Sequence, residues 1–400
     1  MPSLLRQLAS LRGPLAVIAA ISFVSSLGIG VMLPLMPLYA ISLGATPVQL
    51  GLMTSAFAVA NTASQLLSGL FLDRYGSLPF IRAGTATYAF ANGLIATAGN
   101  ALVLIGYRAL AGFGAGGNLV ATRVYLAQIS PAERMAFLNG VLGAAASAGS
   151  VIGPAFGGTV VALFDLRAPF VIVAVTSGLA FLGLLTLPKP AARPATAPTG
   201  LEPLSALNRS VVVLLFANVF LAAGFGGFIT TYAPFATEVR GWTTLEVGII
   251  FSIFGAGSIV LGPWLGHTAD RRGRAPVAIA GSIPVAFFGI ALVFDWPRPL
   301  LYALTLVAGG GIAAFQASWF AMLNDASPAA RRGRTFGVVS AISNLGTVVG
   351  ALASSAVWQA VSLGAGLLLP SLSILCAGLT LLALPRSALR PPVRAPSASA

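Results

Sequence analysis

Runs of about 20 mostly apolar residues, nearly free of charge, recur along the whole of this 400-residue chain. A helix of that length rises about 30 Å, which matches the hydrocarbon core of a bilayer. Only 8% of the residues are charged, whereas soluble domains carry about 25%. So little polar surface could not keep the chain in water. The sequence therefore predicts an all-α polytopic membrane protein and excludes an ordinary soluble fold.

Twelve apolar segments can be delimited between the charged and proline-rich stretches. They lie near 14–38, 50–72, 80–99, 101–121, 139–163, 168–187, 211–233, 247–267, 276–295, 299–321, 336–360 and 364–384. The first segment is too long for a cleaved signal peptide, and further spans follow it at once. The predicted parts are a first six-helix half at 1–187, a Pro-rich cytoplasmic linker at 188–210, a second six-helix half at 211–384 and a disordered cytoplasmic tail at 385–400.

The placement of the basic residues predicts the orientation. If the N-terminus is cytoplasmic, 18 of the 22 Lys and Arg residues fall on the cytoplasmic side, as the positive-inside rule requires. Orientation thus explains the net charge of +13, and no nucleic-acid partner is needed. We predict a multi-pass protein of a bacterial plasma (inner) membrane with both termini in the cytoplasm.

Several function classes are excluded by residues that the chain lacks. A single Cys and a single His leave no disulfide framework, thiolate metal site or imidazole cluster. No converging acids or His–nucleophile pair fall within the spans, so we expect no enzyme, no cofactor and no metal. A sensor or scaffold would carry an added soluble domain, and the largest loop here is a short linker.

The sequence also repeats itself with an offset of 197 residues. "GLFLDRYGS" begins at Gly69 and "GHTADRRGR" at Gly266, and "ISPAERMAFLNG" recurs at the same offset as "ASPAARRGRTFG". Each pair occupies the same place within its half. The halves are therefore parallel repeats, an architecture in which transporters place the substrate site between halves that alternate access.

At these residues the chain resembles the major facilitator superfamily. "GLFLDRYG" and "GHTADRRGR" are similar to that family's loop motif, "YRALAGFGAGG" to its fourth-span motif and "GSVIGPAFGG" to the fifth-span motif of drug–proton antiporters. Four such motifs, in order and on the expected spans, cover essentially the whole chain. The resemblance implies a monomer of twelve helices in two pseudo-symmetric halves that rock about a central cavity.

The resemblance assigns a gating and latch role to the loop motif. The residues concerned are Gly69, Asp73, Arg74, Gly76, Arg134, Gly266, Asp270, Arg271 and Gly273. Asp73 is expected to pair with Arg134 or Arg123, or to cap the eleventh span. The alternative is an ordinary solvated ion pair worth under ~1 kcal/mol.

The fifth-span motif consists of small residues that let helices approach closely in lipid. Its members are Gly149, Gly153, Pro154, Gly157 and Gly158. The resemblance implies that this element seals the two halves together and that it is found in members of the family that export their substrates. The alternative is that Gly and Pro are frequent in membrane helices in general.

Arg108 is the one charge in the interior of a span, because Arg82 and Asp295 fall within three residues of a span end. At mid-membrane an Arg costs about 2.5–3.5 kcal/mol on insertion scales, and such residues usually have a function. The resemblance implies a role in proton coupling, whereas a purely structural Arg would extend its charged head toward the membrane surface. His267 lies at a span end, where a structural role is favoured.

The cavity is expected to be apolar with a few polar anchors. Its candidates are Met36, Asn61, Gln65, Arg108, Asn118, Asn218, Phe225, Tyr232, Gln316, Trp319 and Phe320. Each could instead make a helix-packing contact. Asn61 and Gln65 should share one helical face.

No acidic residue falls in the interior of a predicted span, unlike in many relatives, so a permanently cationic substrate would find no partner. A neutral or weakly acidic amphipathic compound fits better, the latter held by Arg108. We predict a drug-exporting antiporter, with protons as the candidate coupling ion. The alternative is an uptake or metabolite permease.

Overall fold

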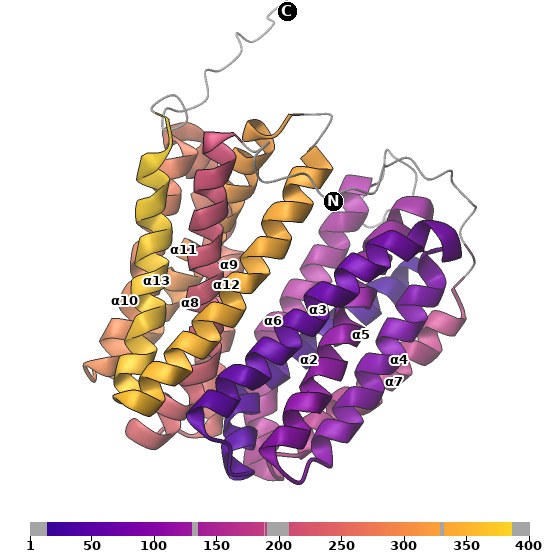
Figure 1. Cartoon of the computed structure of the whole chain (residues 1–400), viewed down its shortest axis with the longest axis horizontal. Helices are drawn as coiled ribbons and strands as arrows, with labels where there is room; N and C mark the ends of the chain where they lie inside the picture. Colours follow the sequence, from indigo (N-terminus) through magenta and orange to yellow (C-terminus); the bar gives the residue numbers. More distant parts are fainter. Residues whose placement is uncertain (1–13, 130–134, 188, 190–207, 329–331, 386–400) are drawn as a thin grey trace, which may run out of the picture. The chain divides into compact units, whose positions relative to one another are not determined.

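The computed structural model describes residues 14–129, 135–187, 189, 208–328 and 332–385, and within these ranges every regular element is a helix (Figure 1). The predicted linker and tail fall almost wholly outside the described residues. The helices are α2 (Pro14–Ser42), α3 (Pro47–Tyr75), α4 (Ser77–Ala96), α5 (Ala101–Ile129), α6 (Met135–Leu163), α7 (Ala168–Leu185), α8 (Arg209–Pro234), η3 (Phe235–Val239), α9 (Thr244–Arg272), α10 (Arg274–Val293), α11 (Arg298–Ala326), α12 (Arg332–Ala360), α13 (Leu363–Thr380) and η5 (Leu381–Ala383).

The long helices α2 to α13 confirm the predicted all-α fold of twelve membrane helices. Among the described residues, nine of them are long and apolar enough by themselves to cross a bilayer. The other three, α3, α4 and α5, carry polar residues such as Asn61, Asn92 and Arg108 that lower their hydropathy. Their counterparts in the second repeat, α9, α10 and α11, are among the nine.

Helix lengths and helix contacts both reproduce the sequence repeat. α3 and α9 each contain 29 residues, α4 and α10 each contain 20, and α7 and α13 each contain 18. A Cβ added to Gly112 would lie 2.3 Å from the Phe57 carbonyl oxygen, and one added to Gly309 would lie 1.9 Å from that of Phe254. Both members of this contact are shifted by the same 197 residues. The duplication therefore extends to individual close contacts between helices.

Local signals explain where several helices begin. Thr46 caps α3 reciprocally with Gln49, and Pro47 occupies the first turn, where its missing N–H costs nothing. Ser362 caps α13 by accepting a hydrogen bond from the Ala365 N–H. These caps place short turns between consecutive helices, so that the chain runs up and down through neighbouring spans.

Contacts divide the chain into two compact units. The first comprises Met1–Thr199 and Tyr232–Ser252, and the second comprises Gly200–Thr231 and Ile253–Ala400. Part of the second repeat, at the end of α8 and the beginning of α9, thus clusters with the first unit. The predicted domain boundaries follow the repeat instead and stay a prediction.

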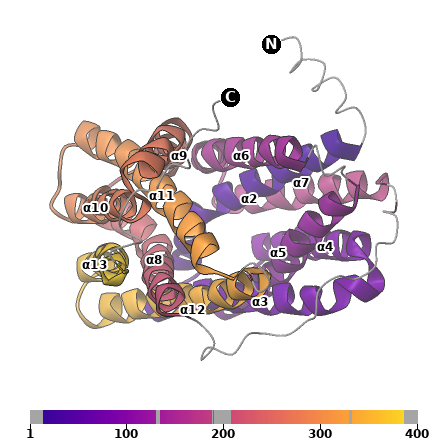
Figure 2. The same cartoon turned by 90° about the horizontal axis from the view of Figure 1, so that it is seen from above.

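Each unit has its own packing. In the first, α2 packs on α6 and α7, and α3 and α4 pack on α5 (Figure 2). In the second, α10 packs on α11 and α13, and α12 packs on α13. Each also has a core of buried apolar side chains, including Tyr125 and Leu184 in the first and Phe315 and Trp319 in the second.

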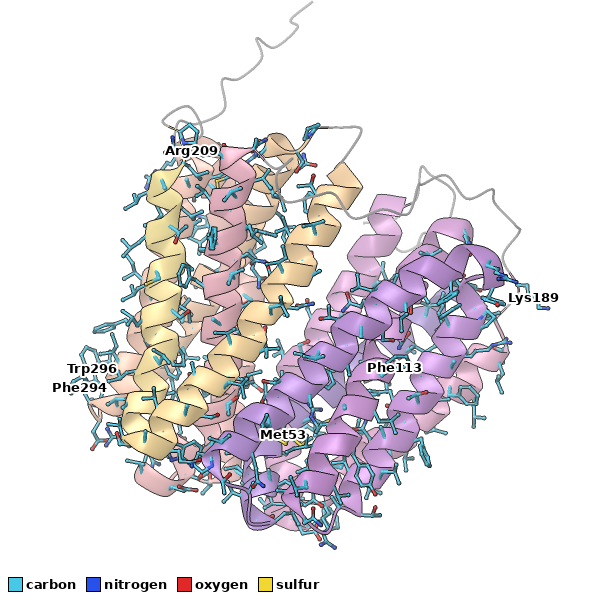
Figure 3. The ribbon with its side chains drawn as sticks, viewed as in Figure 1. Met53, Phe113, Lys189, Arg209, Phe294 and Trp296 are labelled. Atoms are coloured by element: carbon cyan, nitrogen blue, oxygen red, sulfur yellow. The ribbon has the colours of Figure 1, made fainter. Side chains whose placement is uncertain are left out.

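Three labelled side chains mark the two ends of the second unit. Figure 3 shows Arg209 at one end and Phe294 and Trp296 at the other. The Asn208 amide donates a hydrogen bond to the Ala326 carbonyl oxygen at 2.7 Å, which joins the beginning of α8 to the end of α11 at the basic end. In membrane proteins basic residues gather on the cytoplasmic side, whereas Trp is enriched at both membrane–water interfaces.

Candidate transport site

The two loop motifs form identical one-residue turns between consecutive helices. Gly76 joins α3 to α4 with φ of 79°, and Gly273 joins α9 to α10 with φ of 105°. Their N–H groups donate to the Leu72 and Ala269 carbonyl oxygens, four residues earlier. Left-handed backbone of this kind strongly favours glycine, because a Cβ would meet its own backbone. Gly76 and Gly273 are therefore required by the turn.

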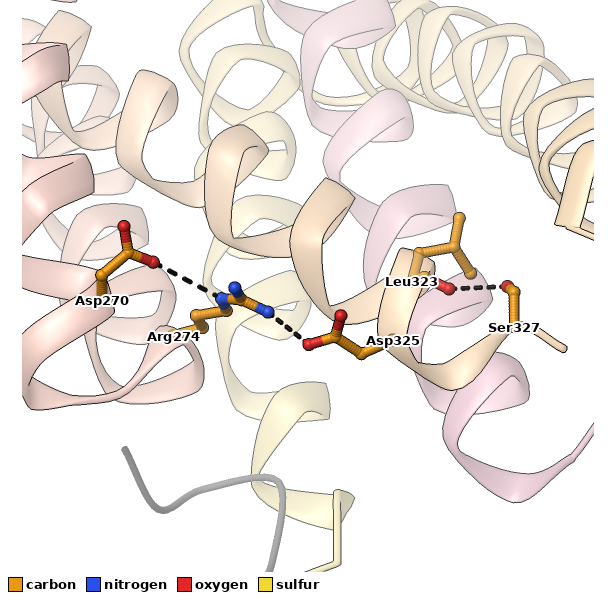
Figure 4. Close-up of polar contacts among 5 residues, drawn as sticks. All are labelled: Asp270, Arg274, Leu323, Asp325 and Ser327. Carbon is orange, nitrogen blue, oxygen red and sulfur yellow. Dashed lines mark hydrogen bonds and ion pairs between the residues drawn. The ribbon is translucent and has the colours of Figure 1, made fainter. Parts of the chain in front are cut away.

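The second loop motif carries a chain of three charges. Arg274 lies with its Nε 3.7 Å from an Asp270 carboxylate oxygen, and its Nη1 donates to Asp325 Oδ2 at the end of α11 (Figure 4). Both carboxylates are mostly exposed, so each pair is worth at most about 1 kcal/mol. The predicted latch residue Asp270 is thus placed beside Arg274, while Arg271 is exposed.

The first loop motif makes an uncharged contact at the positions that correspond to Arg274 and Asp325, 197 residues earlier. Ser77 corresponds to Arg274 and Gln128 to Asp325, and the Ser77 hydroxyl donates to Gln128 Oε1 at 2.7 Å. The two repeats therefore keep the geometry of this contact and differ in its charge. Arg74 is exposed and lies over the Tyr75 ring, 5.3 Å from its centroid.

Part of the predicted latch lies outside what the structure describes. Gly69 and Asp73 fall in described backbone of α3, but their side-chain surroundings are not described. Arg134 lies outside the described residues, and so does the side chain of Arg123. The expected partners of Asp73 stay a prediction.

The glycines of the fifth-span motif form a close contact between α6 and α2. A Cβ on Gly149 would lie 2.4 Å from the Phe23 carbonyl oxygen, and one on Gly153 would lie 2.6 Å from that of Leu27. Gly157 continues the stripe, since a Cβ added there would lie 3.0 Å from Val31 Cγ1. Ordinary side chains would force the two helices apart. This face of the motif therefore serves packing inside the first repeat.

The other face of the motif meets the beginning of α9, within the first unit. A Cβ on Gly158 would lie 2.6 Å from the Thr244 carbonyl oxygen, and one on Gly248 would lie 2.2 Å from that of Pro154. Ser252 Oγ accepts a hydrogen bond of 3.1 Å from the Ala155 N–H. Pro154 and Gly158 thus lie against a matching stripe of small residues, spaced by four, on α9.

Arg108 lies inside the first unit on α5, between α3 and α4. Its guanidinium carbon is 4.2 Å from the centroid of the Phe57 ring, a cation–π contact. Its Nε is buried and has no hydrogen-bond partner. Tyr88 of α4 is an electrostatic neighbour of Arg108, and its hydroxyl donates to Met32 Sδ at 3.5 Å. The guanidinium is therefore held against an aromatic ring with part of its donor capacity unused.

Further polar residues lie on α3 and α5, beginning one helical turn after Phe57 and Arg108. Gln65 Nε2 donates to Asn61 Oδ1 at 2.6 Å, and Asn61 Nδ2 donates to the Gly112 carbonyl oxygen at 3.2 Å. The predicted shared face of Asn61 and Gln65 is confirmed. Thr122 donates to Asn118 Oδ1 at 2.8 Å. These side chains are half-buried, so they still leave some surface for contact with a small molecule.

The candidates in the second unit divide between structural and exposed positions. Trp319 is buried, and its indole N–H donates to the Leu214 carbonyl oxygen at 2.8 Å. Asn218 Nδ2 donates to Ser343 Oγ at 2.8 Å. Phe320 is exposed and stacks on Phe336, 6.1 Å between ring centroids. Phe320 and Phe336 form an aromatic surface, while Trp319 and Asn218 hold helices together.

Burial sorts the whole predicted set into three groups. Met36, Tyr232 and Trp319 are buried; Asn61, Gln65, Arg108, Asn118 and Asn218 are half-buried; Phe225, Gln316 and Phe320 are exposed. Met36, Asn61, Gln65, Arg108, Asn118 and Tyr232 belong to the first unit, and the others belong to the second. Buried members have no free surface in this structure, whereas half-buried and exposed members do.

Sequence reasoning did not single out several residues that the structure brings into these sites. They are Phe57, Arg274, Asp325, Gly248 and Ser252. Gly248 and Ser252 follow the same four-residue spacing of small residues as the fifth-span motif, and that spacing was the available signal. Phe57 offered no such signal.

Comparisons with known proteins agree with this architecture. The family model described as Major Facilitator Superfamily matches residues 18–256 and 214–399. The chain is 30% identical over 359 residues to the class D tetracycline resistance protein of Salmonella ordonez, covering 85% of this chain and 88% of that protein. It is 25% identical over 344 residues to an uncharacterised transporter of the same type from Methanocaldococcus jannaschii, covering 83% and 87%. It is 27% identical over 241 residues to the quinolone resistance protein NorA of Staphylococcus aureus, covering 58% and 62%.

Solved structures share the fold at low sequence identity. The nucleoside transporter NupG superposes with a TM-score of 0.81 at 15% identity, over 93% of this chain and 99% of that one. A bacterial homologue of the human lysosomal transporter Spinster gives 0.71 at 17% identity, over 92% and 93%. At these identities the likeness concerns the fold alone.

Proposed function

This chain belongs to the major facilitator superfamily, and we propose that it is a secondary-active exporter of small amphipathic compounds such as drugs, antibiotics or natural products. Members of the family are membrane transporters of small molecules and not enzymes. The observation that carries the proposal is the 30% identity to a tetracycline resistance protein along 88% of that protein's length. The match covers both repeats.

The packing around Pro154 supports the export direction in our proposal. The fifth-span motif of this chain is complete, and both of its faces are in close contact, one with α2 and one with α9. The corresponding stretch of α12 keeps Gly346 and Gly350 against α8 but has Ala351 in place of proline. This closely packed element occurs in just one of the two repeats. Such an element suits a seal that opens and closes once per transport cycle, as the two halves rock.

The charge distribution supports a neutral or weakly acidic substrate. In the described parts of the chain, every acidic residue lies at a helix end or in a loop, namely Asp73, Asp165, Glu238, Glu246, Asp270, Asp295 and Asp325. A permanently cationic compound would lose its hydration in the bilayer core without meeting an opposite charge. Protons remain our candidate for the exchanged ion. We also propose a monomer in a bacterial plasma membrane with both termini in the cytoplasm.

The test begins with a toxicity screen. An efflux-deficient bacterium producing the chain should become resistant to some amphipathic compounds, and an uncoupler should abolish the resistance. Inside-out vesicles should then accumulate a compound found in this way, whereas vesicles without the chain should not. Accumulation by right-side-out vesicles would instead support the alternative of an uptake permease. A screen with no protected compound would count against export.

A further inference from the structure

We propose that Arg108, together with Phe57 and Tyr88, forms a binding site for the carboxylate of an aromatic or otherwise amphipathic substrate. The proposal rests on the proposed transport function and names the substrate class that its first unit would select. All three residues belong to that unit, so the site needs no contribution from the second.

First, among the described residues, the charge of Arg108 is not balanced by a neighbouring carboxylate. A guanidinium inside a membrane protein is normally paired, because an isolated buried charge is costly. Arg108 lies seven residues from the beginning of α5, and in the described part of the chain no carboxylate contacts it. A ring face lowers this cost only in part, since cation–π contacts contribute about 0.5–2 kcal/mol. An anion is therefore the ligand that Arg108 lacks.

Second, the Nε donor of Arg108 and the hydroxyl donor of Tyr88 lack good acceptors among the residues that the structure describes. Nε of Arg108 is buried without a hydrogen-bond partner, while the residue as a whole is half-buried. The Tyr88 hydroxyl donates to a thioether sulfur at 3.5 Å, which is a weak acceptor that a carboxylate oxygen would replace favourably. Arg108 thus has a donor without an acceptor, and Tyr88 has a donor with a weak one; a carboxylate could serve both.

Third, the apolar side chains around these donors favour an organic anion over an inorganic one. Phe57 covers one face of the guanidinium at 4.2 Å and is itself half-buried. Met32, next to the Tyr88 hydroxyl, is buried and apolar. A strongly hydrated ion gains little from such walls, whereas an aromatic acid gains burial of its ring as well as pairing of its charge.

The second repeat shows that the fold itself does not require this arginine. Thr305 occupies the position 197 residues after Arg108, and its hydroxyl donates within its own helix to the Leu301 carbonyl oxygen at 2.6 Å. Phe254, the counterpart of Phe57, keeps the same close contact with its glycine. The helix packing is thus reproduced with a neutral side chain, so packing does not account for the charge of Arg108.

The experiment compares a carboxylate with its neutral amide on the purified full chain. Binding of 2-naphthoate and of 2-naphthamide is measured by calorimetry in nanodiscs for the unaltered protein, Arg108→Gln and Arg108→Lys. We expect 2-naphthoate to bind at least about tenfold more tightly than the amide, which corresponds to 1.4 kcal/mol. Arg108→Gln should abolish the preference, and Arg108→Lys should keep part of it. Arg209→Gln, which removes an exposed charge, is the matched control and should keep the full preference.

Three results would overturn the assignment. They are equal affinity for acid and amide, a preference that survives in Arg108→Gln, and chloride binding at Arg108 without binding of 2-naphthoate. Thermal unfolding of each variant establishes that it is folded. Binding needs no gradient, so failure here is separate from failure of export, which the vesicle assay measures.

Discussion

The contact of Gly248 with the Pro154 carbonyl oxygen gives the sharpest prediction about the seal between α6 and α9. A Cβ at position 248 would lie 2.2 Å from that oxygen and 2.8 Å from its carbon, both of them backbone atoms. The helices would have to separate by about 1 Å to restore van der Waals contact. Overpacking of this kind typically costs about 1–3 kcal/mol. Gly248→Ala should therefore disfavour the state in which these helices touch.

The size of the effect can be measured by labelling. At 1.4 kcal/mol per tenfold, we expect the population of the separated state to rise about 5- to 140-fold. In a Cys376→Ser background, a cysteine at Thr244 reports on the contact through its rate of reaction with a membrane-impermeant maleimide. Gly248→Ala should raise that rate. Ser252→Ala, which removes the acceptor of the Ala155 N–H, should raise it less, since such a bond contributes about 1 kcal/mol.

Gly143→Ala is the matched control for this experiment. Gly143 lies on α6, and nothing would lie within 4 Å of an added Cβ there. The labelling rate of the Gly143→Ala variant should equal that of the background protein. An unchanged rate in Gly248→Ala, at full expression and with an unchanged control, would refute the reasoning that this contact opens during transport.

Three further predictions concern the loop motifs. Gly273→Ala should lower the free energy of unfolding by about 1–2 kcal/mol because of its left-handed backbone, whereas Gly178→Ala, in open space, should not; equal melting temperatures would contradict this. A double-mutant cycle of Arg274→Gln and Asp325→Asn should give a coupling energy of at most about 1 kcal/mol, and a value near 3 kcal/mol would show that the pair is buried in another state. Asp73→Asn should impair transport at unchanged expression, and full transport in reconstituted vesicles would count against the latch.

Much of the fold could be predicted because bilayer thickness and internal duplication are both visible in the sequence. Apolar run lengths indicated twelve helices, and the offset between "GLFLDRYGS" and "GHTADRRGR" indicated two copies of one pattern. The glycines at 76 and 273 were recognised as motif residues, and their positive φ values supply the physical reason. Local requirements of this kind depend on a few neighbouring residues.

Partners across helices were harder to predict, because periodicity gives the face of a helix but not the neighbour that it meets. Asp270 was assigned to the latch together with Arg271, yet the structure pairs it with Arg274, one turn further along. Likewise, Arg108 was recognised as unusual, but nothing in the sequence indicated that Phe57 would cover it. The stripe of Gly149, Gly153 and Gly157 was expected between halves, and the structure packs it on α2 of the same repeat.

The most direct test of export by exchange uses the purified protein in liposomes, with a compound identified in the toxicity screen. Vesicles are loaded at low pH and diluted into buffer of higher pH, so that protons can leave only through the transporter. The account predicts that the compound accumulates inside against its own gradient, and that an uncoupler abolishes this accumulation. Equilibration without accumulation, at the same rate with and without the pH gradient, would contradict it.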